Sequence, residues 1–243
     1  IAAAKVRGER EGMGSDVVRG PGCMRLGLLR MSRSRVVLEQ EDGLVIVSAM
    51  RLDEQGLAAR DGLGKVTRVI RLAGFHGSDD RFYKERYDAT VLAVQGQIYF
   101  TGTDPKKGER YFEPDGFLEP EDELPVAGAE LFCFDTDPAE GILRIEAGGG
   151  TLITGDSLQN WDRVDRYFSW FGGVVMRMMG FIKPHNLGPG WIKGCKPSTD
   201  DVARVLELEF DNVLPAHGAP VLGGARQAYQ PAVEEYVAKW KDK

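Results

Sequence analysis

Three loops that follow β-rich runs carry the side chains of this sequence that are best suited to binding a metal. His76 shares one loop with Asp79 and Asp80, Asp156 lies in the second, and His217 lies in the third. Strand ends on one side of an α/β sheet converge, so residues far apart in the chain can meet in one cleft there. Zinc, iron and manganese accept mixed imidazole and carboxylate ligands. These residue types therefore predict a divalent metal site.

Each of these residues also has a simpler structural interpretation. Asp79 and Asp80 precede a predicted helix, where an acidic residue serves as a cap. Asp156 follows a glycine at the end of a hairpin, where an aspartate often closes a turn through its own backbone. His76 and His217 could each be loop histidines that bond to a backbone carbonyl. The residue types alone leave both interpretations open.

The first half of the chain alternates between predicted strands and helices. Residues 35–40 and 44–49 are β-branched runs joined by an Asp-Gly turn, which predicts a β-hairpin. We expect a helix over residues 53–64 with Asp53 as its N-cap and Gly64 as its C-cap. A strand over 66–73, a helix over 80–87 and a strand over 89–94 follow. This alternation is typical of a layered α/β protein.

The second half repeats the alternation after a charged loop at residues 101–125. Strands are predicted over 129–134, 142–147 and 151–154. Residues 161–181 show near-helical apolar spacing, which we expect to break at Gly172 and Gly173. A capped helix is predicted over 198–210, and a final helix over 225–242 that Pro231 could interrupt.

Composition excludes several classes of function. The 31 Lys and Arg against 37 Asp and Glu give a formal charge of −6, which disfavours nonspecific nucleic-acid binding. No apolar run reaches the roughly 18 residues that a membrane span needs. Three cysteines without a C-x-x-C spacing indicate neither disulfides nor a cysteine zinc site, and favour a cytoplasmic location. Three histidines are too few for a histidine-rich binuclear centre.

The length of 243 residues suits one large domain. Residues 1–23 lack apolar periodicity, so we expect a disordered N-terminal arm. Residues 24–243 are then a single domain.

From about residue 35 onward, the order of the motifs resembles the metallo-β-lactamase fold superfamily. An opening hairpin precedes a His/Asp loop, then Leu-Ile-Thr-Gly-Asp at 152–156 and Leu-Pro-Ala-His-Gly at 214–218. The resemblance implies a four-layered αββα sandwich. It also matches Asp156 to the bridging aspartate of that family and His217 to its final histidine.

The first motif of that family, H-x-H-x-D-H, is only partly retained. Gly74 stands at the first histidine, His76 at the second, Ser78 at the aspartate and Asp79 at the last histidine. The turn that carries the middle histidine of the family would fall near residues 124–129, which contain no histidine.

The resemblance therefore implies at most one divalent metal, held by some of His76, Asp79, Asp156 and His217. Zinc is the first expectation, iron or manganese the alternatives, and a site without metal stays open. Such an ion would polarise an ester, thioester or phosphoester bond as a Lewis acid. Asp80 would then act as a general base or orient a ligand.

The expected function is a metal-dependent hydrolase of a small-molecule substrate. The alternative is a protein that has kept the fold, lost the metal, and acts in binding or as a scaffold. Redox chemistry at a single iron is a weaker third interpretation. We expect no nucleic-acid or membrane partner, and a homodimer is compatible with the sequence.

Overall fold

The computed structural model describes residues 5–6, 17–26, 29–102, 107–164 and 168–241 of the chain, and two large β-sheets dominate it. Within these residues, seven strands form the first sheet in the order β1-β2-β3-β4-β5-β6-β9. These strands are β1 Lys5–Val6, β2 Val17–Leu26, β3 Leu29–Gln40, β4 Gly43–Val47, β5 Val66–Arg71, β6 Thr90–Val94 and β9 Gly116–Leu118.

The second sheet is formed, in the described part of the chain, by five strands in the order β10-β11-β12-β15-β16. They are β10 Ala129–Phe134, β11 Glu140–Ile145, β12 Thr151–Thr154, β15 Asn212–Pro215 and β16 Val221–Leu222. Two short pairs complete the described strands, namely β7 Tyr99–Phe100 with β8 Arg110–Phe112, and β13 Leu158–Gln159 with β14 Asn186–Leu187.

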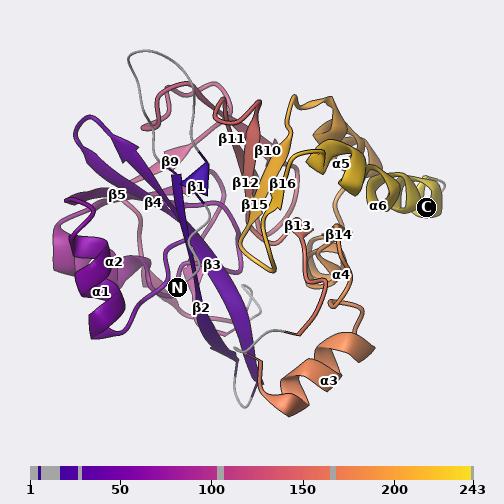
Figure 1. The fold of residues 1–243 in the computed structure, drawn as a ribbon, viewed down its shortest axis with the longest axis horizontal. Coiled ribbons are helices and arrows are strands. Elements are labelled where there is room, and N and C mark those ends of the chain that lie inside the picture. Colours follow the sequence, from indigo (N-terminus) through magenta and orange to yellow (C-terminus); the bar gives the residue numbers. More distant parts are fainter. Residues whose placement is uncertain (1–4, 7–16, 27–28, 103–106, 165–167, 242–243) are drawn as a thin grey trace.

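Helices cover the outer faces of both sheets, as Figure 1 shows for α1 and α2 on one side and α5 and α6 on the other. The described helices are α1 Glu54–Asp61, α2 Asp80–Tyr87, α3 Trp170–Met178, α4 Pro189–Cys195, α5 Thr199–Arg204, the short 3₁₀ helix η1 Val205–Glu207, and α6 Ala225–Trp240.

Three apolar clusters hold these layers together. Val45 and Ile70 of the first sheet meet Leu143 of the second in a core between the sheets. Tyr83 of α2 packs in a second cluster on the outer face of the first sheet, and Tyr229 of α6 packs in a third on the outer face of the second sheet. The predicted αββα sandwich is therefore confirmed.

Several local expectations are also met. β3 and β4 pair antiparallel as the predicted opening hairpin. Asp53 caps α1 by accepting from the Gly56 backbone N–H, and Ser198 caps α5 by accepting from the Asp201 N–H. α2 begins at Asp80 as expected. The C-cap of α1 is Gly62 and not Gly64.

Other expectations need correction. Residues 17–23, predicted to be disordered, lie in β2, whereas residues 1–4 and 7–16 of the expected arm lie outside the described part. β2 pairs with β3 along its whole length, and this backbone pairing needs no apolar periodicity in the sequence.

Within the described residues, no helix is long and apolar enough to cross a bilayer.

The two predicted helix breaks do not occur. Gly172 and Gly173 are buried inside α3, where a Cβ on Gly173 would lie 3.0 Å from Val164, so the glycines permit close packing. Pro231 lies inside a continuous α6. Apolar burial of Tyr229 and Val233 on either side of the proline outweighs its cost of about 3 kcal/mol.

Gly218, directly after His217, yields a prediction about the loop that carries this histidine. Its φ is +91°, and a Cβ there would lie 2.0 Å from the Asn160 carbonyl oxygen, whereas a Cβ on Gly224, with φ +65°, would meet nothing within 4 Å. Gly218→Ala therefore combines backbone strain with a backbone clash, and Gly224→Ala has the strain alone. We expect Gly218→Ala to lower the urea unfolding midpoint clearly more than Gly224→Ala. Equal midpoints would show that the contact with Asn160 is not tight.

Candidate metal centre

His76, Asp156 and His217 converge at one end of the two sheets. His76 Nε2 lies 3.1 Å from His217 Nε2. Asp156 Oδ1 lies 3.4 Å from His76 Nε2 and 3.0 Å from His217 Nε2. In the described part of the chain, these three residues are the group whose ligand atoms could together hold a metal ion.

Strand pairing brings Asp156 and His217 together. β12 and β15 are parallel neighbours, with Thr154 opposite Pro215, so the loops that follow them leave the same edge of the sheet. The Ala216 N–H donates to the Thr154 carbonyl at 2.9 Å, and the Asn160 N–H donates to the His217 carbonyl at 3.0 Å. The backbone therefore fixes the spacing of the two side chains.

A link between the two sheets positions His76. After β5, Ala73 forms an antiparallel bridge with Glu140 of the second sheet, and the Gly141 N–H donates to the Leu72 carbonyl at 2.8 Å. This approach requires a glycine at 155, because a Cβ there would lie 2.5 Å from Ala73 Cβ. The His76 loop is thereby held against the Asp156 loop.

The cluster is buried, which determines its charge. Burial lowers the pKa of His76 to about 4, and the nearby charge of Arg33 adds to the shift. Burial opposes ionisation of Asp156, but the two histidines outweigh it and hold the pKa of this carboxyl well below its usual value. At neutral pH the cluster therefore contains a neutral His76 and an ionised Asp156. These are the protonation states in which each group can bind a metal.

The geometry fits a divalent metal. Zinc bonds of about 2.0–2.1 Å in a tetrahedral shell place neighbouring ligand atoms roughly 3.3–3.4 Å apart, close to the 3.0, 3.1 and 3.4 Å found here. Asp156 Oδ2 is buried without a hydrogen-bond partner. Two imidazoles and one carboxylate form a ligand set found in catalytic zinc sites and in mononuclear iron sites.

Comparison with known proteins finds its matches among solved structures. No family model matches the sequence, and no curated protein matches it. A β-lactamase domain protein from Burkholderia ambifaria is 16% identical, with 93% of this chain and 76% of that chain covered and a TM-score of 0.55.

Two metallo-β-lactamases are similar over nearly their whole length. One, from Pseudomonas aeruginosa and solved in a mono-zinc form, is 10% identical, with 97% of this chain and 96% of that chain covered and a TM-score of 0.58. A subclass B3 metallo-β-lactamase of Bradyrhizobium japonicum is 13% identical, with 90% of this chain and 92% of that chain covered and a TM-score of 0.52. This chain has the metallo-β-lactamase fold.

Within the metallo-β-lactamase fold, the structure separates the two predicted aspartates from the cluster. Asp79 is not part of it, and its Oδ2 accepts a hydrogen bond from the Arg51 backbone N–H at 3.0 Å. Asp80 is buried, and its Oδ2 accepts from the Tyr99 hydroxyl at 2.7 Å. Burial raises the pKa of Asp80 despite this donor. A side chain bonded in this way is suited to anchoring the first turn of α2.

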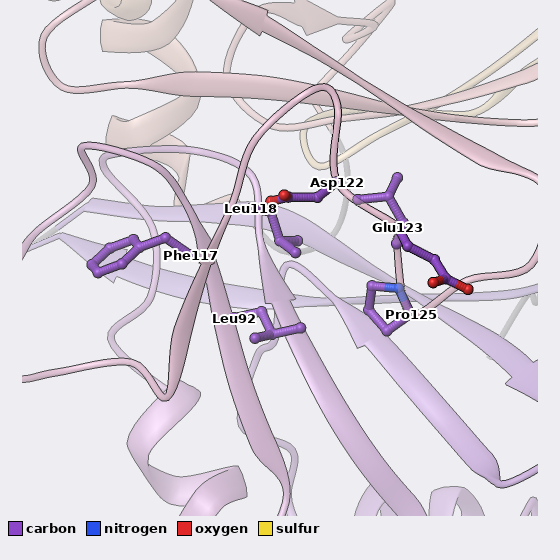
Figure 2. A pocket seen from close by; sticks show the side chains of 7 residues that line it. Leu92, Phe117, Leu118, Asp122, Glu123 and Pro125 are labelled. Atoms are coloured by element: carbon purple, nitrogen blue, oxygen red, sulfur yellow. The ribbon is translucent and has the colours of Figure 1, made fainter.

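Residues 124–129, where the turn with the middle histidine of the family would fall, contribute no residue to the cluster. Leu124 and Pro125 line an open hollow beside Leu92 of β6 (Figure 2), and Val126 packs in the core between the sheets. Leu92, Phe117, Leu118, Asp122, Glu123, Leu124 and Pro125 line the hollow. None of these residues belongs to the cluster.

Glu140 is the buried neighbour of the cluster that sequence reasoning missed. Its Oε1 accepts from the backbone N–H groups of Asp156 at 2.6 Å and of Ser157 at 2.8 Å. Burial raises the pKa of Glu140, and the Asp156 carboxylate adds to the shift. An acidic residue at the start of an apolar strand was the available signal. Glu140 therefore fixes the backbone on which Asp156 sits.

We expect Glu140→Ala to destabilise the protein by about 1–3 kcal/mol, because the backbone N–H groups of Asp156 and Ser157 lose their acceptor. Glu140→Gln keeps an oxygen acceptor and should retain most of that stability. Urea unfolding of the two variants measures the difference. Glu130→Ala, which removes an exposed carboxylate, is the control and should change little. Equal losses for Ala and Gln at position 140 would contradict the role of the acceptor.

Tyr99→Phe tests the anchoring of Asp80. Because the folded pKa of Asp80 is raised, its stabilising contribution is complete below the unfolded pKa of about 3.9 and is lost as pH rises through the folded value. Removing the hydroxyl raises that folded pKa further. The stability deficit of Tyr99→Phe should therefore be smallest near pH 3 and reach about 1–3 kcal/mol at neutral pH.

Unfolding measured across pH checks this prediction. Tyr111→Phe is the matched control, since the Tyr111 ring packs against Tyr99 but the hydrogen bond to Asp80 comes from the Tyr99 hydroxyl. A deficit that does not vary with pH would exclude Asp80 as the group responsible.

Proposed function

We propose that this protein is a metal-dependent hydrolase that holds one divalent cation on His76 Nε2, Asp156 Oδ1 and His217 Nε2. Zinc is the first candidate, with iron and manganese as alternatives. When bound, the cation would supply Lewis-acid polarisation of a small ester, thioester or phosphoester substrate. The observation that carries the proposal is the convergence of the three ligand atoms to within 3.0–3.4 Å of one another.

Neighbouring residues support this role. Glu140 holds the backbone of Asp156 and Ser157, so the carboxylate approaches the histidines from a fixed direction. The Trp161 ring centroid lies 5.1 Å from that of His217, and Trp161 packs against Phe168 and Phe181. This aromatic group restricts rotation of the His217 ring and limits access of water from its side. Both effects favour a preorganised site.

One observation favours the alternative, a protein of this fold that binds other molecules without catalysis. The Nδ1 atoms of His76 and His217 are both buried without a hydrogen-bond partner. In metal sites the second nitrogen of a ligating histidine is usually bonded, which orients the ring and raises the affinity for metal. A site without this support would bind metal more weakly.

Metal content separates the two functions. Protein purified without added metal, and after equilibration with zinc, iron or manganese, should contain close to one ion per chain by elemental analysis. His76→Ala, Asp156→Asn and His217→Ala should each reduce this content to near zero. A wild-type protein that takes up none of the three metals would rule out the hydrolase proposal.

Two matched variants control for general effects of substitution. Asp79→Asn changes a carboxylate on the neighbouring loop, and His185→Ala changes a histidine that packs on Tyr229. Both should retain the metal. Loss of metal in Asp79→Asn would restore Asp79 to the ligand set that the sequence suggested.

A further inference from the structure

Arg33 is a buried cation whose hydrogen bonds are incomplete. It lies in β3 and is 1% exposed, and its Nε and Nη2 atoms have no hydrogen-bond partner. A buried charge without acceptors is costly. The guanidinium is therefore in a state that an added acceptor would stabilise.

Arg33 lies beside the metal cluster. The backbone N–H of the next residue, Ser34, donates to the carbonyl of Ala216 at 2.7 Å. Ala216 directly precedes His217 in the chain. Burial lowers the pKa of Arg33, and the charges of Asp80, Asp79 and Asp156 act in the opposite direction. The arginine is thus within electrostatic reach of Asp156, a candidate ligand.

Arg71 shows what a buried structural arginine looks like in the same region. Its Nε donates to the Ala73 carbonyl at 3.1 Å, its Nη1 to the Ile98 carbonyl at 3.0 Å and its Nη2 to the Gly74 carbonyl at 2.5 Å. Its guanidinium carbon also lies 4.2 Å from the centre of the Tyr99 ring. Every nitrogen of Arg71 is used to fix a loop, whereas two nitrogens of Arg33 are unused.

The two unused atoms of Arg33 form one edge of the guanidinium. Nε–H and Nη2–H point in parallel, which is the fork that binds both oxygens of a carboxylate or two oxygens of a phosphate. A lysine cannot reproduce this geometry. The positive charge and the parallel donors of this edge therefore favour an oxyanion as the acceptor.

We propose that the Nε–Nη2 edge of Arg33 binds an oxyanionic group of the substrate, a carboxylate or a phosphate, next to the metal cluster. The anion site deepens the proposed function, because it makes the substrate anionic. The role of Arg33 in catalysis rests on that proposed function. Because the edge is closed to solvent in this structure, binding requires the groups that cover it to move. The anion then replaces the missing acceptor and compensates the buried charge.

The test measures binding of inorganic phosphate and of acetate by isothermal titration calorimetry. Each titration is done with chelator-treated protein and with zinc-loaded protein. We expect Arg33→Met and Arg33→Lys each to weaken binding of the preferred anion about tenfold or more, as loss of a charged hydrogen-bond pair predicts. Preference for phosphate over acetate, or the reverse, identifies which oxyanion the edge takes.

Arg35→Met is the matched control. Arg35 lies two residues further along the same strand and is also buried with unused nitrogens, but its neighbours include Tyr83 and Arg60. Arg35→Met should leave the affinity for phosphate and for acetate unchanged. Thermal unfolding of each variant establishes that it is folded at the titration temperature. If Arg33→Met does not fold, Arg33→Lys still tests the site, because it keeps the buried positive charge and removes the two parallel donors.

The outcomes distinguish this inference from the proposed function. Anion binding that depends on Arg33 in chelator-treated protein supports the anion site even if no metal ever binds. A wild-type protein that binds neither anion, or binds them with the affinity of its Arg33 variants, overturns the anion site. In that case the metal content of His76→Ala and His217→Ala still tests the hydrolase separately.

Discussion

The backbone bridge between Ala73 and Glu140 joins the ends of the two sheets, and the candidate site depends on it. On one side of the bridge the chain continues into the His76 loop. On the other, the side chain of Glu140 accepts two hydrogen bonds from the backbone around Asp156. The site is therefore a product of sheet-to-sheet docking, and no single β-strand or loop contains it.

Burial gives the centre its electrostatic character. Carboxylates and arginines are brought together in a region with little solvent, where charges interact more strongly than at the surface. Asp156 is stabilised as an anion by two histidines, whereas Asp80 and Glu140 are pushed toward their protonated forms. Arg71 is satisfied by carbonyl groups and Arg33 is not.

The sequence was sufficient to predict the fold and the convergence of His76, Asp156 and His217. The layered α/β class and the convergence follow from local signals, namely β-branched runs, capped helices and polar residues at strand ends, whereas the αββα sandwich followed from the resemblance of the motif order. The roles of Glu140 and Arg33 did not follow from these signals. Each lies in a strand, where alternation predicts only which face a side chain occupies, and their roles arise from tertiary contacts.

The imidazoles of His76 and His217 are 141 residues apart in sequence, yet their Nε2 atoms are 3.1 Å apart. In an unfolded chain, closing a loop of this length has a large entropic cost, so the two rings would rarely meet. An ion that needs both rings would bind the native state and almost ignore the unfolded one. Free metal would then stabilise the folded protein in proportion to the logarithm of its concentration. The ion would act after the chain has folded and would not nucleate folding.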